Sequence, residues 1–293
     1  MSTVGSVTTT SGRRLRIYVD GEPGRPCVFS LHGTPVSGAL YPDIAADAAR
    51  QGLRLVSYDR PGYGGSARHE GRSIADAAAD VAAIADHLGV RRFAVWGHSG
   101  GGPHALACAA LLGERVAACA ALSGPAPYDA EGLDYMAGVG EANVEEFALS
   151  VAGGEPLREF LECERSESAA ADPERLTEAF ASLLSDVDRR ALTPELAGFL
   201  AVETAAALEP GVDGWYDDDL AFVAPWGFDP AGIAVPLRLY HGRHDRFVPA
   251  SHGEWLAAHI PAADARILED EGHLSLYTSG ARDCHPWFQE LLA

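Results

Sequence analysis

One serine stands where the chain could present a nucleophile. Residues 93–96 form an apolar, strand-like run that leads directly into Gly97-His98-Ser99-Gly100-Gly101, and a helix-like run follows at 103–112. This pattern is typical of a nucleophile elbow, in which the serine occupies a strained strand-to-helix turn and glycines prevent a Cβ from colliding with the neighbouring backbone. The turn would leave the amide of Gly100 at a helix N-terminus, suited to stabilise an oxyanion. The same five positions also fit an ordinary turn with a polar residue, so the interpretation depends on the partners that follow.

A serine hydroxyl needs a base beside it and an acid that orients the base. His273 follows the last predicted strand directly, in Glu271-Gly272-His273, and Asp245 follows the strand before it, in His241-Gly242-Arg243-His244-Asp245. Both therefore belong at the carboxyl edge of a sheet, and we predict Ser99, Asp245 and His273 as nucleophile, acid and base. Two plainer explanations stay open: Asp245 as a strand-end turn former, and His273 as a loop histidine with satisfied hydrogen bonds.

The elements that must position these residues are short apolar runs alternating with helical patterns. Residues 1–24 are predicted to form a β-hairpin with its turn at Ser11-Gly12. Strands are expected at 27–31, 53–58, 93–96, 116–122, 237–241 and 265–268, and helices at 39–51, 73–89, 103–112, 251–259 and 286–292. Such alternation indicates an α/β fold with a parallel sheet covered by helices on both faces.

The stretch from 124 to 232 breaks this alternation. It carries helix-spaced apolar residues at 144–161, 173–184 and 194–208 without strands between them, and it is notably acidic. A helical insertion of this size between two core strands is a candidate lid over an active site. We therefore expect one core domain made of residues 1–123 and 233–293, with residues 124–232 inserted as a lid.

On these residues, the sequence resembles the α/β-hydrolase fold superfamily, and within it the serine members that carry a lid. The resemblance rests on the motifs around Ser99, Asp245 and His273 and on two more, His32-Gly33-Thr34-Pro35 and Asp59-Arg60-Pro61-Gly62-Tyr63-Gly64-Gly65-Ser66. It implies a mostly parallel eight-stranded sheet with helices on both faces, a helical lid, and the chain order serine, acid, histidine. It also implies an oxyanion hole made by the amides of Thr34 and Gly100.

Four further residues are predicted to line the substrate pocket: His32, His98, Trp215 and Trp226. The histidines flank the predicted site, and the tryptophans belong to an aromatic cluster near the end of the lid. The alternatives are histidines that only hold turns, and aromatic rings that pack the lid onto the core.

Other polar residues are expected to have structural roles. Asp59 and Arg60 should fasten their own loop, and Asp217-Asp218-Asp219 should form a solvated face or a helix cap. The histidines lie in motifs that turn geometry already explains, so we predict no metal site and no cofactor.

The composition narrows the classes of partner. With 42 acidic against 22 basic residues among 293, the formal charge is −20, which repels nucleic-acid phosphates and anionic lipids. Five cysteines without a close pair argue against a zinc site and against a disulfide framework. No signal-like segment or membrane-spanning run is evident, so we expect a cytoplasmic protein with a small-molecule substrate; a homo-oligomer stays open.

The resemblance implies a serine hydrolase that cleaves an ester or related acyl compound through an acyl-enzyme. Two alternatives remain: a non-hydrolytic enzyme on the same triad, such as an acyltransferase, a lyase or a cofactor-free perhydrolase or haloperoxidase-like enzyme, and a non-catalytic binding protein on the same scaffold. Epoxide hydrolases and haloalkane dehalogenases are disfavoured, because those relatives attack through an aspartate where this chain has Ser99.

Overall fold

The predicted strands assemble into one mostly parallel sheet. The computed structural model describes residues 3–293, and its strands follow the order β1-β2-β4-β3-β5-β6-β7-β8. β2 pairs antiparallel with both β1 and β4, and the remaining neighbours are parallel. The strands are β1 (Thr3–Thr8), β2 (Arg14–Asp20), β3 (Cys27–Leu31), β4 (Arg54–Tyr58), β5 (Phe93–His98), β6 (Val116–Leu122), β7 (Leu237–Gly242) and β8 (Ala263–Leu268). The predicted eight-stranded α/β sheet is confirmed; residues 1 and 2 of the predicted hairpin and core lie outside the described residues.

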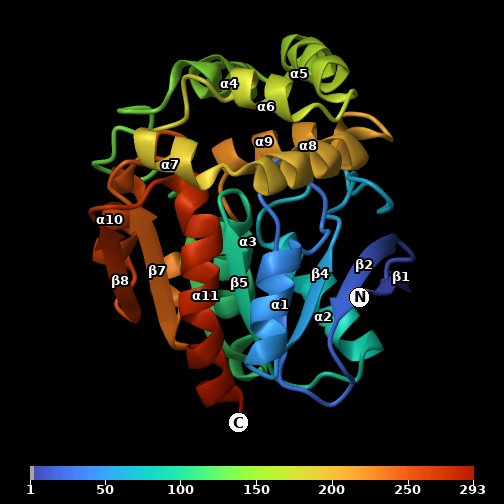
Figure 1. The fold of residues 1–293 in the computed structure, drawn as a ribbon. Coiled ribbons are helices and arrows are strands. Elements are labelled where there is room, and N and C mark those ends of the chain that lie inside the picture. The colour runs from blue at the N-terminus through green and yellow to red at the C-terminus, as the bar shows by residue number, and fades with distance from the viewer. Residues whose placement is uncertain (1–2) are drawn as a thin grey trace.

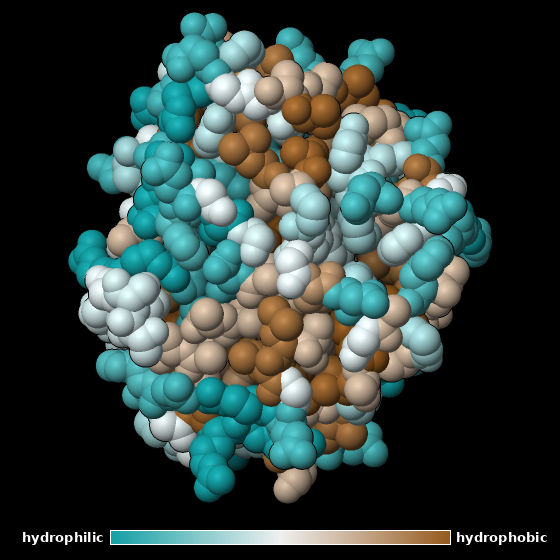
Figure 2. Space-filling view, turned by 180° about the vertical axis from the view of Figure 1, so that it is seen from behind, coloured by the Kyte–Doolittle hydropathy of each residue, from teal (hydrophilic) through white to brown (hydrophobic). Residues whose placement is uncertain are grey.

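Helices cover both faces of this sheet. β5 and β6 are buried at every position, which is the pattern of parallel strands enclosed from both sides. One face carries α1 (Pro42–Arg50) and α11 (His273–Leu292), whose apolar residues share a cluster with Trp96 and Leu122. The other carries α2 (Asp76–His87), α3 (Gly101–Leu111) and α10 (Ala250–His259). Figure 2 shows the molecule from this second side, with apolar side chains gathered in the middle and polar ones toward the margins.

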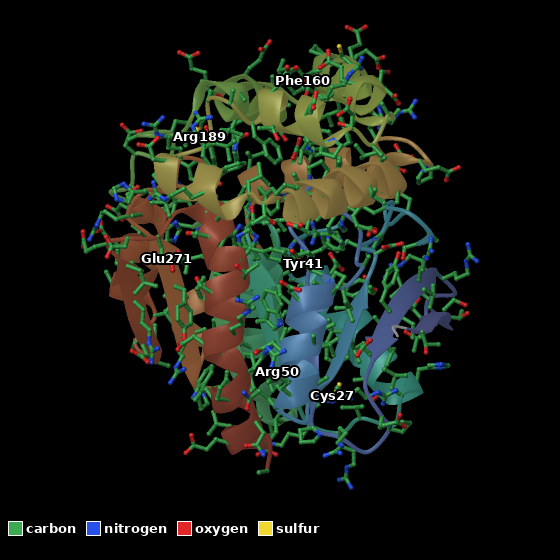
Figure 3. All side chains as sticks on the ribbon, viewed as in Figure 1. Cys27, Tyr41, Arg50, Phe160, Arg189 and Glu271 are labelled. Carbon is green, nitrogen blue, oxygen red and sulfur yellow. The ribbon has the colours of Figure 1, made fainter. Side chains whose placement is uncertain are left out.

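A block of helices is inserted between β6 and β7. In the described chain it contains α4 (Glu141–Ala152), α5 (Gly154–Ser168), α6 (Pro173–Ala179), α7 (Asp186–Ala191), α8 (Pro194–Leu208) and α9 (Asp213–Val223). Figure 1 shows α7, α8 and α9 against the edge where the parallel strands end, with α4, α5 and α6 beyond them. In Figure 3, Phe160 marks the outer layer and Tyr41 the end of α1 that faces the insertion. The ring of Tyr41 packs 5.0 Å from that of Phe199 on α8, so the insertion rests directly on the core.

The helical predictions need three kinds of correction. The run predicted at 144–161 is two helices, because Gly153 and Gly154 adopt positive φ angles of 64° and 73° between them. α7 and α9 were not predicted at all. α11 begins at His273 instead of 286 and contains Pro286, because the buried carboxylate of Asp188 on α7 accepts the amides of its first turn. No helix in residues 3–293 is long and apolar enough to cross a membrane.

Candidate active site

Ser99 occupies a tight turn between β5 and α3. Its φ of 53° lies in the left-handed region, which costs a residue with a Cβ free energy and is held only by the surrounding structure. A Cβ at Gly97 would come 2.0 Å from the carbonyl oxygen of Gly101, and one at Gly101 would come 2.1 Å from that of Leu31. The Ser99 amide donates to the carbonyl of Leu122 at 2.9 Å, which ties the turn to β6. The glycines are therefore required by close backbone packing, as the elbow pattern predicts.

His273 and Asp245 meet at the same edge of the sheet. His273 Nδ1 lies 2.8 Å from Asp245 Oδ2, and the other oxygen of Asp245 accepts the amides of Phe247 and Val248 at 2.9 and 2.8 Å. Burial alone would raise the pKa of Asp245, but the charge and hydrogen bond of His273 hold that pKa below its usual value. The ring of Phe247 stacks on that of His273 with centroids 4.5 Å apart, which fixes the plane of the imidazole.

Ser99 and His273 line one cavity of about 850 Å³ between the insertion and the sheet. No hydrogen bond joins Ser99 Oγ to His273 within residues 3–293, although both border the same space. Links of this kind are often long in the unliganded state of an enzyme and shorten when substrate binds. The structure thus brings together the predicted base and acid in direct contact and places the predicted nucleophile in the cavity beside them.

The two predicted oxyanion donors lie next to each other. A Cβ at Gly100 would come 2.5 Å from Thr34 Oγ1, and a Cβ at Gly33 would come 3.4 Å from Ser99 Cβ. Neither the amide of Thr34 nor that of Gly100 donates to another group of the described chain. Both residues border the cavity, so two amides without a protein acceptor flank Ser99.

Asp218 on α9 binds the loops around these amides. It is fully buried and accepts hydrogen bonds from Arg60 at 2.6 Å, Arg72 at 2.7 Å, Tyr63 at 2.9 Å and Thr34 Oγ1 at 2.9 Å. Burial would raise its pKa, but the two guanidinium groups outweigh burial and hold the pKa far below the usual range. A charged residue of the insertion therefore fixes the loop that carries Thr34.

The expectation for the aspartate run was wrong. Asp217, Asp218 and Asp219 are all buried in place of forming a solvated face. Asp217 binds Arg68 at 2.8 Å, whereas Asp219 has no arginine partner in the described chain. Arg60, expected to fasten its own loop, also reaches 158 residues along the chain to Asp218. Local sequence cannot show such partners.

The two histidines predicted for the substrate pocket both line the cavity but hydrogen bond to the backbone. His32 lines the cavity, but its Nε2 accepts the amide of Arg60 at 3.0 Å and its Nδ1 lies 2.7 Å from the carbonyl of Gly33. His98 also lines the cavity, and its Nε2 donates to the carbonyl of His273 at 2.9 Å. Burial lowers the pKa of His98 to about 3, so it stays neutral. Both histidines therefore hold the backbone of the site.

The two tryptophans also differ. Trp215 lines the cavity and donates from Nε1 to Glu146 Oε1 at 2.7 Å. The structure places Trp226 elsewhere: it belongs to the core cluster on the α2–α3 face, where its ring stacks on that of Phe228 at 5.7 Å.

Glu146, Asp219 and the capping residue Asp188 carried no sequence signal that pointed to the site. Residues 3–293 contain no group of three or more His, Cys, Asp or Glu side chains placed to hold a metal ion.

Comparison with known families and curated proteins gives consistent matches. Residues 26–279 match the family described as "alpha/beta hydrolase fold". The chain is 39% identical to epoxide hydrolase A of Mycobacterium tuberculosis over 121 residues, which cover 40% of this chain and 37% of that protein. It is 34% identical to a non-heme haloperoxidase of Rhodococcus erythropolis over 161 residues, covering 50% and 58%. The matched segments thus span only part of the length of these curated relatives.

Solved structures resemble the whole fold. A thermophilic esterase from Thermogutta terrifontis superposes with a TM-score of 0.72 at 20% identity, covering 99% of this chain and 100% of the other. At that identity the likeness concerns the fold alone.

Proposed function

Because the chain belongs to the alpha/beta hydrolase fold family, we propose that this enzyme is a serine hydrolase that cleaves an ester or a related acyl compound. The observation that carries the proposal is the placement of Ser99, in a left-handed turn, beside the same cavity as the Asp245-paired His273. A serine held in that way can reach a carbonyl that enters the cavity, and a histidine oriented by a buried carboxylate can take its proton.

The proposed reaction has two halves. His273 Nε2 accepts the Ser99 proton as Oγ attacks the carbonyl, and the amides of Thr34 and Gly100 stabilise the oxyanion. The tetrahedral intermediate collapses, the leaving group takes the proton from His273, and an acyl-serine remains. Water then loses a proton to His273 and attacks the acyl group, which releases the acid and restores Ser99.

A fluorophosphonate probe and a panel of p-nitrophenyl esters of increasing chain length test this proposal. We expect the wild-type protein to be labelled at Ser99 and to hydrolyse at least one ester, and we expect Ser99→Ala to lose both the label and at least about 10³-fold in kcat. Circular dichroism of the variant checks that it is folded. A folded wild-type protein that is neither labelled nor active on any ester would overturn the proposal in favour of a binding protein.

Transfer to another acceptor is the second candidate, favoured by the similarity to a protein named as a haloperoxidase. The acyl-enzyme would be the same, and the acceptor would be an alcohol or hydrogen peroxide in place of water. Product analysis with and without methanol or peroxide separates the two functions. Exclusive transfer without free acid would replace hydrolysis by acyl transfer, whereas free acid as the main product supports hydrolysis.

A further inference from the structure

Two carboxyl groups of the insertion face each other at the cavity. Burial raises the pKa of Glu146 on α4 and of Asp219 on α9, and the charge of Glu146 raises the pKa of Asp219 further, so the two carboxyl groups retain a proton between them. The carboxylate of Glu146 accepts the indole N–H of Trp215, and the hydroxyl of Ser150 donates to the backbone carbonyl of Glu146. Both carboxyl groups line the cavity that contains Ser99.

This pair has acceptor capacity that the protein does not use. Asp219 is only 5% exposed, and its Oδ2 has no hydrogen-bond donor in the described chain. Burial raises the pKa of Asp219 well above its usual value, and the charges of Glu146 and Asp218 raise it further. A buried carboxyl without a donor costs free energy, so its retention beside a cavity calls for a partner that enters from outside.

The neighbouring aspartates show what is missing. Asp217 and Asp218, the two residues before Asp219, each bind arginine side chains within 3.0 Å. Asp219 has the same chemistry and similar burial, yet no cation of residues 3–293 contacts it. The missing partner of Asp219 therefore has the character of a cation that donates hydrogen bonds.

The cavity as a whole also favours a cation. Its lining includes one arginine, Arg175, against seven carboxylic residues in the described chain: Glu145, Glu146, Glu164, Glu167, Asp172, Glu178 and Asp219. Such a lining attracts a positive group and repels a negative one.

The pair is also within reach of the reacting atoms. Asp219 precedes Phe222 by one helical turn on α9, so their Cβ atoms lie about 5–6 Å apart on one face. The tip of the Phe222 ring would lie 2.9 Å from a Cβ at Gly100. A substrate whose carbonyl sits at Gly100 and whose chain passes Phe222 would bring its far end to Asp219.

We propose that Glu146 and Asp219 form a binding site for a primary ammonium group, so that the enzyme acts on acyl compounds whose acyl chain ends in a protonated amine. The inference rests on the proposed function, because it names the substrate class of the same cavity. On binding, the ammonium donates to both carboxyls and the shared proton leaves to solvent.

Matched esters test the site. p-Nitrophenyl 6-aminohexanoate and 8-aminooctanoate are compared with p-nitrophenyl heptanoate and nonanoate, in which a methyl group replaces the ammonium. We expect kcat/KM to favour each amino ester about tenfold or more, because a hydrogen bond to a charged partner contributes about 1.5–3 kcal/mol. The preference should disappear in the double variant Glu146→Gln, Asp219→Asn, whose amides can hydrogen bond to each other. Glu141→Gln removes one exposed charge from the same helix at a position that does not line the cavity, and should keep the preference within about twofold.

Binding without turnover keeps the two proposals separate. Titration calorimetry of hexylammonium and 1-hexanol is carried out on the wild-type protein and on the double variant. Tighter binding of the ammonium to the wild type, lost in the double variant, supports the site whether or not any ester is cleaved. Hydrolysis of the neutral esters without preference for the amino esters overturns the site and leaves the hydrolase intact. An unlabelled Ser99 and no ester turnover overturn the hydrolase, and the calorimetry then decides the site alone.

Discussion

Asp245 determines where the proton sits on the ring of His273. Asp245 Oδ2 accepts the Nδ1–H of His273, and this places the lone pair on Nε2. The second oxygen is engaged by two backbone amides, so the carboxylate cannot rotate away. The proton transfer proposed from Ser99 to His273 needs this tautomer.

Asp245→Asn should therefore reduce kcat about 10³- to 10⁴-fold with little change in KM. The amide keeps an oxygen for the amides of Phe247 and Val248 but turns its NH₂ toward His273, which moves the ring proton to Nε2. Ester hydrolysis and thermal unfolding measure activity and stability. Asp270→Asn, an exposed change three residues before His273, is the control. A loss below about tenfold would show that Asp245 is not the orienting acid.

Among single residues, the sequence predicts those that directly follow the carboxyl end of a parallel strand. Asp245 and His273 could be paired because each follows a parallel strand, and their contact is observed at 2.8 Å. The role of Asp218 could not be predicted, since its partners Arg60 and Thr34 lie 158 and 184 residues away and no local pattern marks them.

Helix α7 of the insertion fixes the start of the helix that carries His273. Asp188 on α7 is fully buried, and its Oδ1 accepts the amides of Leu274 and Ser275 at 2.7 and 3.2 Å. Its Oδ2 accepts the hydroxyl of Ser185 at 2.8 Å. These amides belong to the first turn of α11, which begins at His273, so a negative charge stabilises that end of the helix.

Asp188→Ala should lower kcat about 10- to 100-fold and destabilise the fold by about 1–3 kcal/mol, because two buried amides lose their acceptor. Asp188 acts through His273, so KM should change less than kcat and the rate of fluorophosphonate labelling at Ser99 should fall in parallel. Asp188→Asn, which also caps helices well, should recover most of the lost kcat and most of the lost stability. A normal labelling rate in a destabilised Asp188→Ala protein would mean that the cap is only structural.

Element boundaries follow tertiary contacts more than local pattern. β3 and β6 have the predicted bounds because a buried parallel strand is a continuous apolar run. The start of α11 does not, because its cap comes from α7, which lies far away in the sequence. The bounds of α9 are not predicted, because three successive aspartates suggest a solvated face or helix cap unless the arginines that neutralise two of them are known.

The contact between α4 and α9 should weaken as pH rises. Burial raises the pKa of Glu146 from 4.5 to about 7, and the charge of Glu164 raises it further, whereas the Trp215 hydrogen bond and the neighbouring Asp219 oppose the rise. Below about pH 4.5 Glu146 is protonated in both folded and unfolded chains. Between about pH 4.5 and 7 the unfolded chain releases this proton and the folded one keeps it, so stability falls; above that range the loss is constant.

The glutamine of Glu146→Gln cannot ionise, so the variant should become more stable relative to the wild type as pH rises. We expect its free energy of unfolding, relative to wild type, to be about 1–3 kcal/mol larger at pH 8 than at pH 5. Urea unfolding at the two pH values measures the difference. Glu145→Gln removes the same charge from an exposed neighbour. Its free energy of unfolding relative to wild type should change little between pH 5 and pH 8. If Glu146→Gln differed from the wild type by the same free energy of unfolding at both pH values, the raised pKa of Glu146 would be contradicted.

The whole molecule adds a long-range field to the local carboxyl pair. Its formal charge of −20 should draw cationic substrates toward the protein from any direction, whereas Glu146 and Asp219 act only on a group already in the cavity. Salt separates the two effects, because it screens charges across open solvent far more than contacts inside a cavity.

Raising KCl from about 20 mM to about 500 mM shortens the Debye length from about 20 Å to about 4 Å. We expect kcat/KM for p-nitrophenyl 6-aminohexanoate to fall several-fold over this range, and that for the neutral heptanoate to change by less than about 1.5-fold. The variant with Glu146→Gln and Asp219→Asn alters only two of the 42 acidic residues, so it should keep a salt dependence for the amino ester while losing the preference for it at high salt. Equal salt effects on both esters would contradict steering by the field. A preference in the wild type that vanishes completely at high salt would assign it to the overall charge, because a contact within the cavity persists when the field is screened.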